Sequence, residues 1–584
     1  MVLRLRTSCT AVLLLAGLTA FLGIGSSAAV AKNQAAASSS ETLSGDYLSA
    51  AVAGADRDPQ SASKFYRRAL AIDKGNPELM ERAFAAMLAA GEIEGSFFYA
   101  SKLQGRGQHN TLANLALAVR AIKIGDFKQA HDFLTKLGGA DSSDVTAIAL
   151  TAWSEAGLGH TQKALATLAR LKGADAIAAY RCYHMALIND LAGNAEEARK
   201  YYKQAQDLEP TTLRLVDARA RFEARNGDVP EAKRLFGDFE RNAPRNPLIK
   251  QGLVEVDKGA ATPRLISTAQ QGAAEALFGL AASSGREGED FAAVLYLRLA
   301  LFLDPSNAVA AVTLGEIYER GKSYEQAIGA YGEVPANSPL RQSTDLQIGL
   351  DLVALEKYDD AVAHMHKVID AHPDDLEAYA ALGDALRANK NFAEAANAYG
   401  KAIDLSGPPV GSNWLLYYDR GICLERSKQW PKAEGDLKKA LELSPDQPLV
   451  LNYLGYSWVD QGLNVDEAFK MLRRAVDLRP KDGYVIDSLG WAFYRMGRYD
   501  DAVRELEKAI ELKPNDATIN NHLGDAYWHV GRKLEATFQW AHARDMQPEP
   551  EDLPGILRKI ETGMLDDKPP TPQAVSEPAK ADGG

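Results

Sequence analysis

Cysteine is nearly missing from this 584-residue chain, which contains only Cys9, Cys182 and Cys423. So few thiols cannot stabilise a chain of this length, and a disulfide-rich fold is excluded. The repeat described below places Cys182 and Cys423 seven units apart, and distant units of a repeat array do not touch. We therefore expect both thiols to be unbridged, with Cys182 packed in the core as a small apolar side chain.

Basic residues are fewer than acidic ones. The chain has 66 Lys and Arg against 78 Asp and Glu, which gives a formal net charge of -12. A protein that binds nucleic acid concentrates Lys and Arg against the phosphates. The acidic balance therefore predicts that the protein has no nucleic-acid partner.

Long apolar runs are missing after the N-terminal segment. The one run, Ala11 to Ile24, follows two arginines and is shorter than the roughly 20 residues that a membrane-spanning helix needs. It leads to Ala29-Val30-Ala31, the small-x-small pattern of a signal-peptidase site. We expect residues 1–31 to be a signal peptide cleaved after Ala31, and the mature chain to be periplasmic without a membrane span. An uncleaved anchor and a peripheral association with the envelope stay open as alternatives.

Common catalytic motifs are absent as well. The sequence has no Gly-x-Ser-x-Gly motif and no His-Glu-x-x-His motif. Gly315 and Gly321 resemble a phosphate loop, but five residues separate them where that motif requires four. His522, Asp525 and His529 share one helix face, yet a zinc site needs a tighter ligand set. We expect no catalytic residue, no metal and no cofactor, so the protein is not an enzyme. An enzyme concealed within the repeats is the alternative of another class.

What the sequence does contain is an internal repeat with a period of about 34 residues. A small residue in the second half of each unit returns at this interval, with a break between residues 245 and 272. Two later steps are longer, by four residues at the loop 406–412 and by one at the turn 462–466, so the extra residues fall between helices. The marker residues are Ala62, Ser96, Ala130, Ala164, Ala198, Ala232, Ala293, Ala327, Ala361, Ala395, Ala433, Ala468, Ala502 and Ala536.

Each well-formed unit has Leu-Gly, an aromatic residue, a Gly-centred turn, further Ala and a closing Pro. Gly and Ala let two helix backbones approach, large residues at i, i+3, i+4 and i+7 form a buried stripe, and Pro ends the second helix. The clearest units contain Leu454-Gly455, Leu489-Gly490 and Leu523-Gly524, then Ala475, Ala509 and Ala543, then Pro480, Pro514 and Pro548. This pattern resembles the tetratricopeptide (TPR) repeat, which has the same period and two antiparallel helices in each unit. The resemblance covers about residues 43–550 and implies an all-α helix-turn-helix solenoid, a superhelix of about 14 repeats.

The register also predicts how the chain is divided. The N-terminal units lack the Leu-Gly pair, and the C-terminal units keep it. The stretch between them is either a shortened repeat or a hinge. The expected segments are a signal peptide (1–31), a flexible linker (32–42), a degenerate TPR block (43–244), an irregular connector or shortened repeat (245–272), a regular TPR block (273–550), a capping helix (551–565) and a disordered tail (566–584).

The first helix of a late unit carries two stripes. Leu489 and Phe493 belong to the apolar one, and Trp491 and Tyr494 to the other. In TPR proteins the second stripe lines the concave groove, so the resemblance implies a partner there, and truncating Trp491 and Tyr494 should leave stability almost unchanged. Packing of Trp491 or Trp528 between adjacent helices is the alternative. The expected partner-binding residues are Tyr418, Arg426, Asn452, Tyr456, Asp487, Trp491, Tyr494, Arg495, Asn521, Asp525, Trp528 and His529.

The last three units also resemble large bacterial cell-envelope TPR proteins, including adaptors of carboxyl-terminal processing proteases. Those adaptors are typically lipid-anchored, whereas Cys9 precedes the apolar run and cannot be a lipoprotein cysteine. The resemblance implies an exported scaffold that binds a protein or peptide. The most specific version of this hypothesis is that the scaffold presents substrates to such a protease in the periplasm. A scaffold for envelope or exopolysaccharide assembly is the alternative.

Overall fold

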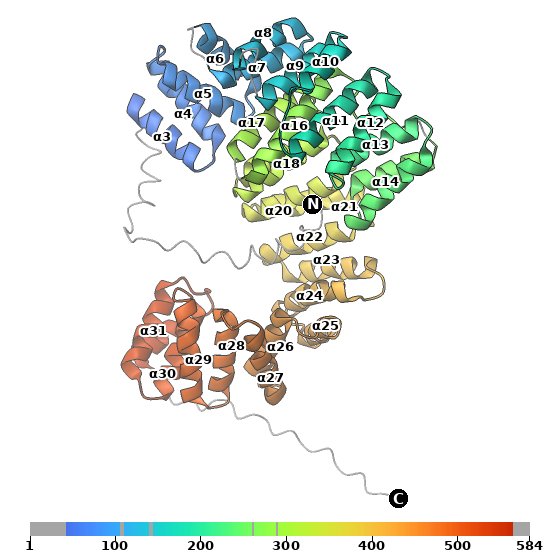
Figure 1. Cartoon of the computed structure of the whole chain (residues 1–584). Coiled ribbons are helices and arrows are strands. Elements are labelled where there is room, and N and C mark those ends of the chain that lie inside the picture. The colour runs from blue at the N-terminus through green and yellow to red at the C-terminus, as the bar shows by residue number, and fades with distance from the viewer. Residues whose placement is uncertain (1–41, 106–109, 139–143, 260–261, 288–289, 565–584) are drawn as a thin grey trace, which may run out of the picture. The chain divides into compact units, whose positions relative to one another are not determined.

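The computed structural model describes residues 42–105, 110–138, 144–259, 262–287 and 290–564. Every regular element within these ranges is a helix, which confirms the all-α prediction (Figure 1). The predicted signal peptide, all but the last residue of the linker, and the predicted tail lie outside the described residues. None of the helices described is both long and apolar enough to cross a membrane.

Contacts divide the chain into two compact units, Met1–His364 (unit 1) and Met365–Gly584 (unit 2). Each is built from helix pairs. The pairs up to the division are α3 (Leu43–Ala55) with α4 (Pro59–Ile72), α5 (Pro77–Ala89) with α6 (Ile93–Gly105), α7 (Thr111–Lys123) with α8 (Phe127–Gly138), α9 (Val145–Gly157) with α10 (Thr161–Leu168), α11 (Asp175–Leu191) with α12 (Ala195–Leu208), α13 (Leu213–Arg225) with α14 (Val229–Asn242), α16 (Ala269–Glu287) with α17 (Asp290–Leu303), α18 (Ala308–Arg320) with α19 (Tyr324–Gly332), and α20 (Arg341–Ala354) with α21 (Tyr358–Ala371), which contains the division.

Unit 2 continues the pattern and ends in a single helix. Its elements are α22 (Leu376–Ala388) with α23 (Phe392–Leu405), the short 3-10 helix η2 (Gly411–Asn413), α24 (Trp414–Arg426) with α25 (Trp430–Leu443), α26 (Pro448–Gln461) with α27 (Val465–Leu478), α28 (Gly483–Arg495) with α29 (Tyr499–Leu512), α30 (Ala517–His529) with α31 (Lys533–Asp545), and α32 (Leu553–Thr562). Helix α32 packs on α31 and buries Ile556. It lies inside the segment predicted to form a capping helix.

The marker residue of the repeat coincides with the second helix of every pair. All fourteen marker residues lie in second helices and are at most 3% exposed, because a larger side chain at these close helix crossings has no room. The turns inside the pairs follow the same register. Gly91, Gly125, Gly159, Gly193 and Gly227 all have positive φ, the left-handed conformation that glycine adopts without steric cost.

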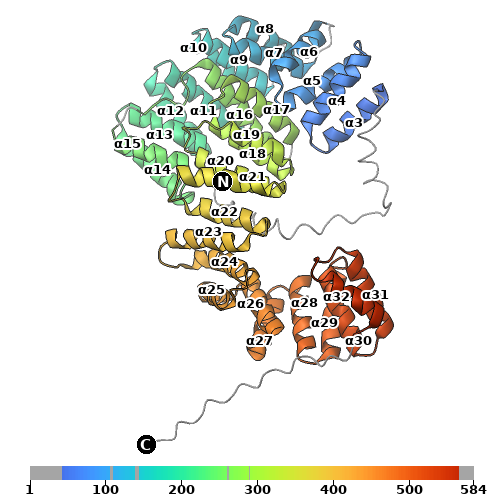
Figure 2. The same ribbon diagram turned by 180° about the vertical axis from the view of Figure 1, so that it is seen from behind.

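The break in the register has a structural counterpart. Helix α15 (Pro247–Asp257) is not followed by a second helix that would complete a pair within the described residues. It packs instead on the preceding pair, α13 and α14, through buried Ile249 and Val256. The described residues between α15 and α16 form no helix. After this segment the chain returns across its own N-terminal helices, so that α16 packs on α7, α9 and α11, and α17 packs on α5, α6 and α7 (Figures 1 and 2).

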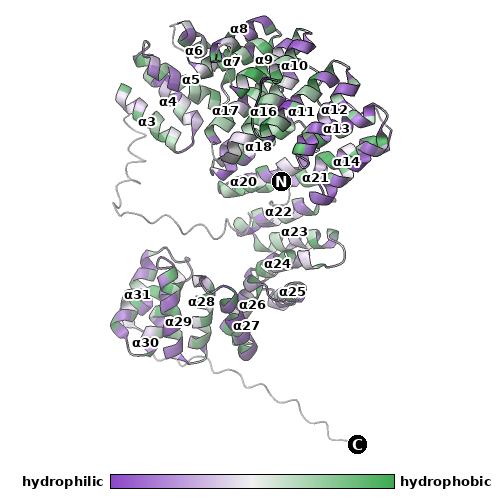
Figure 3. Cartoon of the chain, viewed as in Figure 1, coloured by the Kyte–Doolittle hydropathy of each residue, from purple (hydrophilic) through white to green (hydrophobic). Residues whose placement is uncertain are grey.

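This return joins early and late helices of unit 1 in one large apolar cluster, beside a smaller one on α13, α14 and α15. The buried cluster runs from Ala50 to Ile348 and includes α16 and α17 together with the first helices around them. Figure 3 shows the apolar residues gathered where α16 meets α9, with hydrophilic residues on helices such as α12 and α14. Cys182 and Cys423 are buried and free, as expected from the sequence.

A buried carboxylate, Asp351, lies beside the half-buried Glu319 between α18 and α20. Asp351 is 2% exposed and its Oδ2 has no hydrogen-bond partner, while Glu319 accepts hydrogen bonds from the Tyr331 hydroxyl at 2.6 Å and from Gln347. Burial, together with the charge of Glu319, raises the pKa of Asp351 from 3.8 to about 9. Near neutral pH the folded chain therefore retains a proton that the unfolded chain has released.

We expect Asp351→Asn to stabilise unit 1 at pH 8 and to flatten its pH dependence. Because the folded pKa is raised, the stability that this proton contributes is fully present below about pH 4 and is lost as the pH rises toward 9, by about 1.4 kcal/mol per pH unit. The asparagine amide donates to Glu319 without titrating. Thermal melts between pH 5 and 9 measure the difference, with Asp360→Asn, an exposed carboxylate on α21, as control. Parallel pH profiles for wild type and Asp351→Asn would contradict the assignment.

Candidate functional site

The residues predicted to bind a partner all lie on first helices of unit 2. They are distributed over four consecutive pairs: Tyr418 and Arg426 on α24; Asn452 and Tyr456 on α26; Asp487, Trp491, Tyr494 and Arg495 on α28; and Asn521, Asp525, Trp528 and His529 on α30. The structure brings neighbouring members into contact within and between helices. It also covers several of them.

On α28 the indole of Trp491 is held between two rings. It stacks on Tyr494 of its own helix at 4.7 Å between centroids and on His522 of α30 at 4.1 Å. Asp487 is 6% exposed and lies 3.0 Å from Nδ1 of His522. Burial lowers the pKa of His522, but the Asp487 carboxylate more than offsets this and leaves the pKa raised. Asp487 and Trp491 therefore join α28 to α30.

Tyr494 and His529 form a second contact between the same helices. Tyr494 is 8% exposed, and its ring meets His529 edge-on at 5.4 Å. The His529 ring stacks in turn on Tyr499 at 4.3 Å. The Tyr494 ring thus has little surface left for a partner.

On α30 the predicted residues face the capping helix. Lys559 of α32 donates to Asn521 at 3.0 Å and to Asp525 at 2.6 Å, and the indole of Trp540 donates to Asp525 at 2.8 Å. Gly563 lies so close to Trp528 that an added Cβ would be 2.0 Å from the indole ring. The last pair is therefore closed by the chain itself.

Exposure varies along this face: Asp487, Tyr494 and Asp525 are buried, and the other predicted residues are half-buried or exposed. Arg426 is exposed, and its guanidinium lies 3.8 Å from the carboxylate of its neighbour Glu425. Tyr418, Asn452, Tyr456 and Arg495 are half-buried. A part of the predicted set thus remains accessible on the first-helix face, and the assignment of all twelve residues to partner binding stays a prediction.

Sequence reasoning missed a polar cluster at the start of this face. Asp384 and Arg387 of α22 lie 3.4 Å apart, Asp419 of α24 lies 3.9 Å from Arg387, and the Tyr399 hydroxyl donates to Asp384 at 2.7 Å. Burial raises the pKa of Asp419 to about 7, although Arg387 opposes the shift. Asp384 and Arg387 occupy register positions equivalent to Asp525 and Trp528 four pairs later, so extending the stripe to α22 would have found them.

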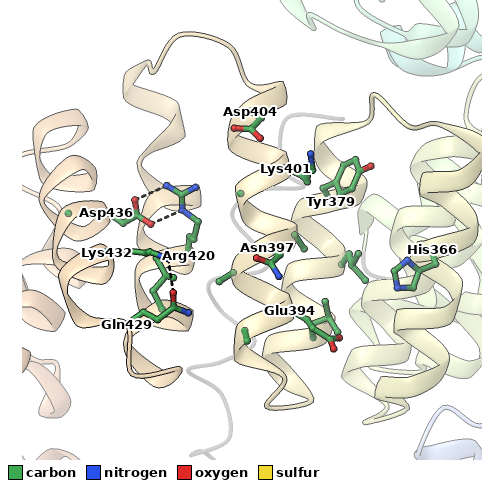
Figure 4. A pocket seen from close by; sticks show the side chains of 18 residues that line it. His366, Tyr379, Glu394, Asn397, Lys401, Asp404, Arg420, Gln429, Lys432 and Asp436 are labelled. Atoms are coloured by element: carbon green, nitrogen blue, oxygen red, sulfur yellow. Dashed lines mark hydrogen bonds and ion pairs between the residues drawn. The ribbon is translucent and has the colours of Figure 1, made fainter.

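A groove of about 880 Å³ lies around α23 and is lined by residues from α21 to α25. Its apolar floor includes Leu382, Leu386 and Leu424, together with Ala396 and Gly400. The polar residues that line it are His366, Tyr379, Glu394, Asn397, Lys401, Asp404, Arg420, Gln429, Lys432 and Asp436 (Figure 4). We call this surface the α23 groove.

The walls of the α23 groove are polar. The Arg420 guanidinium donates two hydrogen bonds to the Asp436 carboxylate, at 2.6 and 2.7 Å, and the Lys432 ammonium donates to the Gln429 side chain at 2.9 Å (Figure 4). The loop 406–412, which holds the four extra residues of this repeat step, connects α23 to α24.

No group of three or more His, Cys, Asp or Glu side chains within the described ranges is arranged to hold a metal ion. His522, Asp525 and His529, which share a helix face, have separate partners: Asp487, Lys559 and Tyr499. The first helices of unit 2 thus carry aromatic, amide and guanidinium side chains.

Protein-family models match several segments of the chain. A model described as tetratricopeptide repeat matches residues 346–408 and 412–483, and another with that description matches residues 179–212. A model described as TPR repeat matches residues 490–531. These segments coincide with helix pairs of both units.

A TPR repeat-containing protein of Pseudomonas aeruginosa is 30% identical over 195 residues, which cover 32% of this chain and 31% of that protein. The match thus spans about a third of the length of this relative.

Solved structures with similar architecture include a chain of the APC/C hetero-tetramer Cut9-Hcn1, with a TM-score of 0.37 and 16% identity over 92% of this chain and 99% of that one. A tetratricopeptide repeat protein from Parabacteroides merdae has a TM-score of 0.35 and 16% identity over 49% and 97% of the two chains. Yeast Tom70 has a TM-score of 0.29 and 14% identity over 89% and 95%. With family models matched to segments of both units, and with helix pairs that return at the period of the repeat, the chain contains tetratricopeptide repeats in both units.

Proposed function

We propose that this protein is an exported, non-enzymatic scaffold that binds a protein or peptide on the first-helix face of unit 2 and presents substrates to a carboxyl-terminal processing protease in the periplasm. Tetratricopeptide repeat proteins are generally scaffolds, and their fold is suited to binding protein partners. The protease and the compartment are the specific parts of the proposal.

The accessible part of the first-helix face carries the proposal. Arg426 is exposed, and Tyr418, Asn452, Tyr456 and Arg495 are half-buried along α24, α26 and α28. Aromatic rings and Arg provide most of the binding energy at protein interfaces, and an Asn amide pairs with an extended backbone. The corresponding face of unit 1 is covered by α16 and α17.

Export is supported by the N-terminal sequence alone. The apolar run and Ala29-Val30-Ala31 have the order of a cleavable signal peptide. We propose that the mature protein begins at Lys32 in the periplasm. N-terminal sequencing of the full-length gene product, isolated from cell envelopes, tests this, and an intact Met1 end would exclude cleavage.

Charge reversal at Arg426 tests the binding face. The mature protein with Arg426→Glu is compared with Lys508→Glu, since the two side chains are 55% and 59% exposed and Lys508 lies on the second helix α29. We expect Arg426→Glu to weaken capture of the processing protease or its substrate from envelope extract by at least about tenfold, and Lys508→Glu to bind like wild type. Equal binding by both variants would exclude this face.

The protease assignment needs its own measurement. Purified carboxyl-terminal processing protease is given a captured substrate with wild-type scaffold, with Arg426→Glu, or without scaffold. We expect substrate cleavage to be faster only with wild type. Capture of envelope-assembly components with no effect on proteolysis would replace the adaptor by the assembly scaffold. If wild type captures no protein that Arg426→Glu fails to capture, the scaffold proposal itself is removed.

A further inference from the structure

Helix α16 occupies the first-helix face of unit 1. It packs on α7, α9 and α11, which are consecutive first helices, and the segment after α15 is what brings it there (Figures 1 and 2). In a regular array α16 would continue the solenoid from its end. Instead it lies against helices from much earlier in the chain.

The close approach requires small residues on α16. A Cβ added at Gly272 would lie 2.2 Å from the ring of Trp153 on α9, and one at Gly279 would lie 2.9 Å from Tyr180 on α11. Ala273 and Ala276 are completely buried. The hydroxyl of Tyr180 also donates to the Ala276 carbonyl at 3.1 Å, so the face contacts the helix backbone directly.

One carboxylate sets the position of α16 on this face. Glu275 is 2% exposed and accepts hydrogen bonds from Arg214 Nε at 3.0 Å and from Arg214 Nη2 at 2.5 Å. The hydroxyl of Tyr183 donates to the same carboxylate at 2.9 Å. Burying a carboxylate without such partners is strongly unfavourable. A helix shifted by one turn would bury Glu275 without them and leave Arg214 unpaired.

We infer that the first-helix face of α7, α9, α11 and α13 is a helix-binding site, occupied in this chain by its own α16, and that its ligand class is an α-helix with a Gly and Ala stripe and one central carboxylate. The covalent connection gives α16 a high effective concentration, so it excludes a free helix of equal affinity. The site accepts an external helix of this class when the contacts of α16 are weakened.

A displacement experiment on the intact mature chain tests this site. A fluorescent peptide with the sequence of residues 269–287 is added to wild type, to Glu275→Ala, and to Glu78→Ala, in which an exposed carboxylate is removed from α5. We expect Glu275→Ala to bind the peptide at least about tenfold more tightly than wild type or Glu78→Ala. We also expect it to prefer this peptide at least about tenfold over the same peptide carrying Glu275→Ala.

Absence of binding by a folded Glu275→Ala chain, or equal binding of the two peptides, would overturn the inference. If that variant does not fold, the exchanged pair Arg214→Glu with Glu275→Arg supplies the test. We expect the double variant to recover most of the melting temperature that either exchange alone removes, because opposite charges again meet on the same contact. Failure to recover would show that Glu275 does not determine how α16 binds.

Discussion

Replacing Arg214 by alanine is expected to lower the free energy of unfolding of unit 1 by about 3 to 5 kcal/mol. The guanidinium is the main partner of Glu275, which is 2% exposed between α11, α13 and α16. Burial raises the pKa of Glu275, and Arg214 with the Tyr183 hydroxyl more than offsets this, so that the pKa lies below its usual value. Without Arg214 the charge is buried with a single neutral donor.

The size of this loss depends on the unpaired charge and not on the lost contact alone. We therefore expect the double variant Arg214→Met with Glu275→Leu, which removes both charges and keeps the volume, to be clearly more stable than Arg214→Ala. Amide hydrogen exchange of α16 in the intact chain measures both variants locally. Protection of α16 that is unchanged in Arg214→Ala would contradict the role given to the pair.

Truncating Trp491 and Tyr494 to alanine together is expected to destabilise unit 2 by about 3 kcal/mol or more. Trp491 is stacked between Tyr494 and His522, and Tyr494 is 8% exposed against His529. Both rings thus contribute to the packing of α28 on α30. The stripe pattern predicted that the two truncations would leave stability nearly unchanged, and the packing predicts the opposite.

Thermal melts and partner affinity measured on the same variants separate these expectations. Tyr456→Ala is the matched comparison, because its half-buried ring has no stacking partner among the rings of the described residues. We expect it to change the melting temperature less than the double truncation does. A double variant that melts like wild type and has lost partner binding would restore the assignment of Trp491 and Tyr494 to a binding surface.

The helix pairs, their order and their register followed from the sequence because the signals are local. Leu489, Gly490 and Phe493 specify one helix face, Ala502 and Ala509 mark the close crossing, and a turn glycine or Pro ends each helix within a few residues. Each of these constraints acts within one unit or between neighbours. The period of the repeat therefore predicted all fourteen helix pairs.

The tertiary structure alone decided which faces are covered. Asp525 and Trp491 belong to the same stripe as Arg426, yet Lys559 of α32 reaches Asp525 and His522 of α30 covers Trp491, whereas Arg426 stays exposed. Likewise, nothing in the periodicity of α16 indicates that Glu275 meets Arg214. Such contacts depend on where a break in the register returns the chain and on how far each helix is from the end of the array. A pattern that acts within one unit and between neighbours carries no information on either.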